Sequence, residues 1–213
     1  HISTFVYHYT ALVYYMSAMF KANGLPYPRT IIFSGNGSKY IDNYITDSKT
    51  CLKQITELIV SKVYETEISD IELVLPTERK ESTCYGGLYH RAEAKEPKPV
   101  VYLGDGSNSE YKDVEAVNSA YSSGMKNKLA NEIAAMNSIY KEVLDVLIQQ
   151  SVIEQVDSAR MKEVVDSVVN DALVSKFQTE ILDKYMRQEP FNDTLFFLPV
   201  VEAVLQLTGI YKK

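Results

Sequence analysis

The stretch Ile31-Ile32-Phe33-Ser34-Gly35-Asn36-Gly37-Ser38-Lys39-Tyr40 decides the fold that the sequence predicts. Its first part, with Thr30 in front, is a short β-branched and aromatic run that stops at a loop of glycine, serine and asparagine. β-Branched and aromatic residues favour strands, whereas glycine permits the backbone conformations of tight turns. The sequence therefore predicts a strand, a glycine loop and then a helix that begins near Lys39.

On both sides of this stretch, apolar residues recur at helical spacing. One such run covers residues 5–21 and ends at Asn23-Gly24, a typical helix stop, and another covers residues 50–64. A second apolar run, Asp70 to Pro76, follows and is typical of a buried strand. Because strand, helix and strand alternate, we expect residues 31–33 and 71–75 to form neighbouring parallel strands of an α/β layer.

A charged segment with two prolines, Glu93 to Pro99, separates this α/β region from the rest of the chain. We place the domain boundary there, so that residues 1–92 form the α/β part and residues 93–213 a mainly helical extension. A short strand or hairpin is expected near residues 100–112. Apolar residues then step by three or four, which predicts long amphipathic helices over residues 114–147, 156–186 and 195–210.

Composition excludes several classes of function. The chain has 22 Lys and Arg against 28 Asp and Glu, a formal net charge of -6, and no basic cluster. Nonspecific nucleic-acid binding is not expected, because it needs cations that displace counterions from phosphate. The two cysteines form no CxxC pair and the three histidines are scattered, so no zinc site is expected and a reducing, cytoplasmic location is the simplest interpretation.

The most hydrophobic stretch, Leu195 to Ile210, raises the question of a membrane. Its sixteen residues include Pro199, Glu202 and Gln206, and are therefore too few and too polar to span a bilayer. We expect this stretch to pack on the preceding helices. Peripheral membrane attachment is the alternative, although no basic residue accompanies the stretch before Lys212.

Two segments together resemble a known superfamily. Residues 31–40 resemble the adenosine motif of the actin, sugar-kinase and heat-shock-chaperone ATPases. Residues 71–87, IELVLPTERKESTCYGG, are similar to the last conserved stretch of actin, in which strand, proline, Glu-Arg-Lys, Ser and Gly-Gly occur in the same order and spacing. The resemblance implies an α/β fold for residues 1–92, namely part of the actin-like (ribonuclease H-like) ATPase half-domain on the adenosine side, followed by the mainly α-helical region.

The resemblance also implies a nucleotide site. Glycines in the loop let the backbone approach the adenosine, and Ser38 would cap the next helix and present free amides to the ligand. Tyr40 and Lys80 would lie beside the adenine, although a half-buried aromatic residue and a solvated loop lysine remain alternative interpretations. Asn36 departs from the Gly-Gly that the family prefers. The implied cofactor-binding residues are Gly35, Asn36, Gly37, Ser38, Tyr40 and Lys80.

In that family, phosphate loops and a metal-bound carboxylate precede these motifs, and the local candidate Gly104-Asp105-Gly106 follows them and is better read as a turn. We therefore expect a fragment that contributes the adenosine side of an ATP/ADP and Mg²⁺ cleft, has no catalytic residue of its own, and needs the missing N-terminal lobe as partner. The alternative is a helical protein–protein interaction module whose α/β half no longer binds nucleotide, with a possible homo-oligomer through its long helices.

Overall fold

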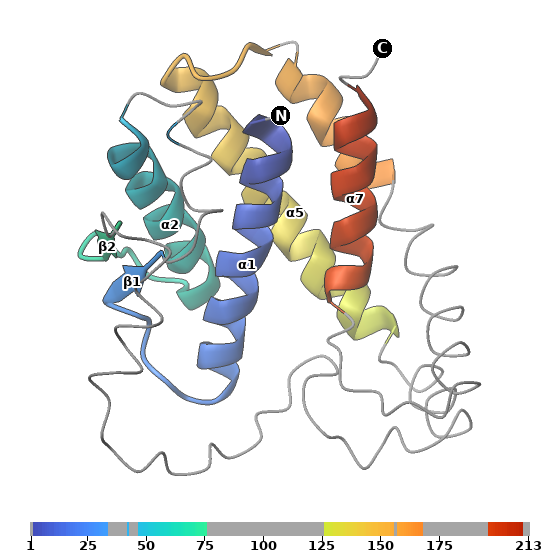
Figure 1. Cartoon of the computed structure of the whole chain (residues 1–213). Helices are drawn as coiled ribbons and strands as arrows, with labels where there is room; N and C mark the ends of the chain where they lie inside the picture. Colours follow the sequence, from blue (N-terminus) through green and yellow to red (C-terminus); the bar gives the residue numbers. More distant parts are fainter. Residues whose placement is uncertain are drawn as a thin grey trace, which may run out of the picture. The chain divides into compact units, whose positions relative to one another are not determined.

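The computed structural model describes residues 2–33, 42, 47–75, 126–155, 157–167 and 196–210 (Figure 1). These residues belong to two compact units. Unit 1 contains residues 3–15 and the described residues from 126 onward, and unit 2 contains the described residues from 16 to 75. The named elements are α1 (Ile2–Ala22), β1 (Thr30–Ile32), α2 (Ser48–Tyr64), β2 (Glu72–Val74), α5 (Lys126–Gln149) and α7 (Phe197–Ile210), and residues 157–167 are also helical.

Unit 2 is built around a β-α-β element. Strands β1 and β2 are parallel neighbours, with Ile31 opposite Leu73 and Ile32 opposite Val74. The amide of Phe33 donates to the carbonyl of Val74 at 3.0 Å and extends the ladder. This pairing confirms the prediction of neighbouring parallel strands, which followed from the length of the connection between them.

The predicted fold class, an α/β half-domain of the actin-like (ribonuclease H-like) type, is wrong. Helix accounts for 75% of the described residues, and the described part of the chain has only two strands, each of three residues. A parallel sheet in an α/β domain is normally covered on both faces, yet Ile32 of β1 is 61% exposed. The prediction failed because two strand-like runs reveal a local pairing but not the number of strands in a sheet.

The end of α1 agrees with the sequence. Gly24 has φ of +67°, its amide donates to the carbonyl of Lys21 at 3.0 Å, and the amide of Leu25 donates to the carbonyl of Phe20 at 2.9 Å. This is the Schellman motif, in which a left-handed residue lets two amides satisfy the last helical carbonyls. The helix stop predicted at Asn23-Gly24 is therefore confirmed.

Two other helices end with a left-handed residue that is not glycine. Glu65 follows α2 with φ of 56°, and Ser151 follows α5 with φ of 58°. After α5 the amide of Val152 donates to the carbonyl of Leu147 at 2.9 Å, as in the Schellman motif. Because a Cβ atom disfavours positive φ, both ends carry a local conformational cost that Gly24 avoids.

The core of unit 1 joins the first part of α1 to α5 and α7. The Tyr7 hydroxyl donates to Asn137 Oδ1 at 2.9 Å, and the ring of Tyr7 packs edge-on against Tyr140 with centroids 4.8 Å apart. Tyr14 and Phe196 stack at 5.9 Å, which brings the start of α7 against α1. Burial, with a smaller contribution from the charge of Asp166, raises the pKa of Tyr7, so its hydroxyl stays protonated and donates.

We predict that removing the Tyr7 hydroxyl destabilises the protein, because its buried acceptor Asn137 loses a hydrogen bond. Tyr7→Phe leaves the buried Asn137 amide oxygen without this donor, which should cost about 1–3 kcal/mol of the free energy of unfolding. Urea denaturation followed by circular dichroism measures the loss. Tyr7→Phe combined with Asn137→Leu should recover much of it, because neither polar partner then remains; a double variant as unstable as the sum of both single variants would contradict a direct pair.

We predict that Ser151→Gly raises the free energy of unfolding by roughly 0.5–1 kcal/mol, because glycine adopts positive φ without a Cβ penalty. The greater flexibility of glycine in the unfolded chain offsets part of this gain. Ser151→Ala is the matched control and should give no gain, since alanine keeps the Cβ atom. Thermal unfolding of the two variants measures the difference. Equal melting temperatures for glycine and alanine would show that the left-handed conformation is not what limits this helix end.

Candidate functional site

The residues predicted to bind adenosine lie outside the residues that the structure describes. These are Gly35, Asn36, Gly37, Ser38 and Tyr40 after β1, and Lys80 after β2. The strands in front of them are described. The structure therefore places the starting points of both segments, although it does not place the site residues themselves.

The starting points lie together at the carboxyl edge of the β1–β2 pair. The strands are parallel and in register, so the chain leaves both at the same edge, from Phe33 after β1 and from Leu75 after β2. In open α/β sheets ligands bind outside the carboxyl ends of the strands, and this two-stranded pair shares that edge but is not such a sheet. The described residues therefore show that the two segments start side by side, whereas the nucleotide site stays a prediction.

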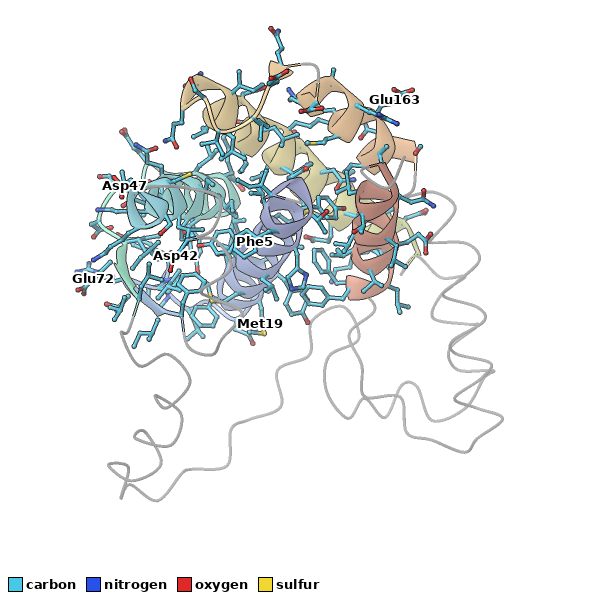
Figure 2. All side chains as sticks on the ribbon, turned by 45° about the horizontal axis from the view of Figure 1, so that its top comes forward. Phe5, Met19, Asp42, Asp47, Glu72 and Glu163 are labelled. Carbon is cyan, nitrogen blue, oxygen red and sulfur yellow. The ribbon has the colours of Figure 1, made fainter. Side chains whose placement is uncertain are left out.

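The amino end of α2, in contrast, is unsuited to phosphate. Asp47 is the N-cap and its carboxylate accepts from the Thr50 amide at 3.3 Å, while the Ser48 hydroxyl donates to Asp42 Oδ1 at 2.7 Å. Figure 2 labels both aspartates. A helix N-terminus attracts anions through free amides and its dipole, but here the Asp47 carboxylate already binds an amide, and the Asp42 carboxylate is held by the Ser48 hydroxyl. A phosphate would have to compete with Asp47 and with the charge of Asp42.

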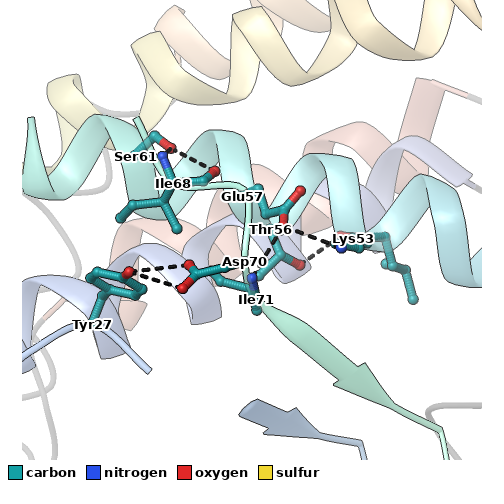
Figure 3. A network of polar contacts seen from close by, with 9 residues as sticks. Tyr27, Lys53, Thr56, Glu57, Ser61, Ile68, Asp70 and Ile71 are labelled. Atoms are coloured by element: carbon teal, nitrogen blue, oxygen red, sulfur yellow. Dashed lines mark hydrogen bonds and ion pairs between the residues drawn. The ribbon is translucent and has the colours of Figure 1, made fainter. Parts of the chain in front are cut away.

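A polar network on α2 fixes the turn into β2 (Figure 3). The Ile71 amide donates to Glu57 Oε1 at 3.2 Å, and the Ser61 hydroxyl accepts from the Ile68 amide at 3.0 Å. Tyr27 donates to the carboxylate of Asp70 at 3.1 Å, and this hydrogen bond is the main reason that the pKa of Tyr27 is raised. Because Glu57 and Ser61 bind main-chain atoms, these contacts fix the position of the turn that precedes β2.

The described residues contain one cysteine, and it is buried. Cys51 on α2 is 2% exposed, and burial, followed by the charge of Asp47, raises its pKa to about 11. The sequence also predicts an inert core thiol at Cys84, which lies outside the described residues. In the ranges that the structure describes, no three His, Cys, Asp or Glu side chains gather in a way that could hold a metal ion.

Helix α7 carries apolar residues on two faces. Val200, Ala203 and Leu207 are buried, whereas Val201 and Leu205, one helical turn apart, are 52% and 56% exposed. We call these two residues the α7 stripe. A surface helix normally keeps its apolar residues on the face toward the core, so exposed apolar residues on a second face are unusual. Sequence reasoning assigned the whole of this helix to internal packing and missed the stripe, although apolar residues on both faces were the signal.

The surroundings of the α7 stripe are weakly charged. Glu202 is the one charged residue among the described residues of α7, and Gln206 donates to its Oε1 at 3.4 Å. On α1, which contacts the start of α7, Leu12 is a further exposed apolar side chain, at 46%. None of the described helices is long and apolar enough to cross a bilayer.

Comparison with known proteins gives no match: no family model, curated protein or solved structure is similar to this chain. Within the described residues, two features are candidates for a binding function. One is the carboxyl edge of the β1–β2 pair in unit 2, and the other is the α7 stripe in unit 1.

We predict that Cys51 does not react with thiol reagents in the folded protein. With a pKa of about 11, only about one thiol in a thousand is ionised at pH 8, and the side chain is buried as well. Labelling a Cys84→Ser variant with a chromogenic disulfide reagent tests this. The thiol should stay unlabelled in native buffer and react fully in 6 M guanidinium, taken as roughly the concentration that unfolds stable domains; rapid native labelling would contradict the inert assignment.

Proposed function

We propose that this chain is a helical protein–protein interaction module. The observation that carries the proposal is the α7 stripe, where Val201 and Leu205 are more than half exposed on a helix whose opposite face is already buried. Single exposed apolar residues are common on protein surfaces, and two of them one turn apart on α7 form a small patch that a partner surface would cover. The stripe would lie against an apolar helical surface of another polypeptide.

The contribution of the α7 stripe to the free energy of association follows from the apolar area that it would bury. Fully burying a valine or leucine side chain stabilises by about 1.5–3 kcal/mol, and roughly half of each side chain remains to be covered. The pair would therefore contribute roughly 1.5–3 kcal/mol to an association, which corresponds to about 10-fold to 150-fold in the dissociation constant. Divided between the two residues this is about 0.75–1.5 kcal/mol each, a moderate contribution below that of an interface hot spot.

The simplest partner is a second copy of the chain. In a two-fold symmetric dimer the same patch meets itself, so the patch must not present a charge to its own image. Neither member of the α7 stripe is charged, whereas the nearby Glu202 keeps its negative charge, because the Gln206 amide that donates to it is neutral. A neutral apolar stripe therefore satisfies the requirement for self-association and gives no reason to expect a highly charged partner such as nucleic acid.

We predict that Leu205→Glu weakens self-association at least 10-fold, because it places a charge where an apolar side chain would be buried. Light scattering and sedimentation at micromolar concentrations measure the change. Asn131→Glu is the control: it adds the same charge to an exposed position of α5, away from the α7 stripe, and should leave association largely unchanged. A wild-type chain that stays monomeric at all concentrations would refute the homotypic interface.

A second candidate function rests on the carboxyl edge of β1 and β2. The segments that resemble the adenosine motif and the Glu-Arg-Lys stretch begin side by side there, which favours a contribution to binding the adenosine of ATP or ADP with Mg²⁺. In this reading the chain is the adenosine-binding part of a longer cytoplasmic nucleotide-binding ATPase, is not catalytic alone, and acts with an N-terminal lobe. The proposal concerns the ligand and does not restore the fold class corrected above.

For this second function we predict no ATP turnover and weak nucleotide binding by the chain alone, since no phosphate-binding loop accompanies the segments. Titration with a fluorescent ATP analogue measures binding. Any binding seen should weaken severalfold in Lys80→Ala and persist in Lys49→Ala, which removes an exposed lysine from the first turn of α2. Equal effects of both variants would indicate nonspecific charge attraction, and turnover lost on changing this chain would identify a complete enzyme.

A further inference from the structure

We draw no further inference here: the strongest candidate, the exposed face of the two-stranded sheet that carries Thr30, Ile32 and Glu72, is an unpartnered surface, and nothing in the described residues shows what covers it.

Discussion

Unit 1 depends on contacts between residues that lie very far apart in the sequence. The hydrogen bond from Tyr7 to Asn137 joins positions 130 residues apart, and the aromatic contacts of Tyr14 reach further still, to Phe196. Closing a loop of that length costs roughly 4 kcal/mol of chain entropy before any contact forms. The apolar face of α5, including Ile133, must offset this cost through burial. The Tyr7–Asn137 hydrogen bond then fixes how α1 and α5 are oriented, because the hydroxyl and the amide oxygen can meet in only one arrangement of the two helices.

Unit 2 is organised by shorter connections and by a different kind of contact. Tyr27 meets Asp70, and α2 holds the next strand through side chains that bind its backbone. Two strands alone make a marginal sheet. The hydrogen bonds that the Ile71 and Ile68 amides donate to Glu57 and Ser61 therefore matter, because they fix where β2 begins relative to α2 and so support the register between the strands.

The sequence predicted local structure better than it predicted the fold. Apolar periodicity indicated α1 and α2, and Gly24 marked a helix end, because both signals act within a few residues. The helix ends at Glu65 and Ser151 could not be predicted from a glycine, since neither position has one. The fold class was wrong because it was extended from two strands to a whole sheet.

The candidate sites show the same division. The parallel pairing of β1 and β2 could be predicted. The carboxylates at the start of α2 were not predicted, because the helix was expected to begin at residue 50 and not at Ser48. The α7 stripe was overlooked since apolar residues are assigned to a core by default, and only the exposures of Val201 and Leu205 reveal that the two faces of the helix differ. The predicted adenosine residues themselves lie beyond the described parts of the chain.

The long separation between α1 and its partners has a consequence for synthesis on the ribosome. Chains are made at about 5–20 residues per second, so roughly 6–26 seconds pass between the emergence of Tyr7 and that of Asn137. Throughout that time the tyrosine-rich face of α1 has none of its α5 contacts, whereas the Tyr27 and Asp70 pair of unit 2 can form after only 43 residues. Unit 2 can therefore fold while the ribosome is still translating, but unit 1 must wait for α5, and until then the first part of α1, residues 3–15, exposes the apolar side chains that unit 1 later buries.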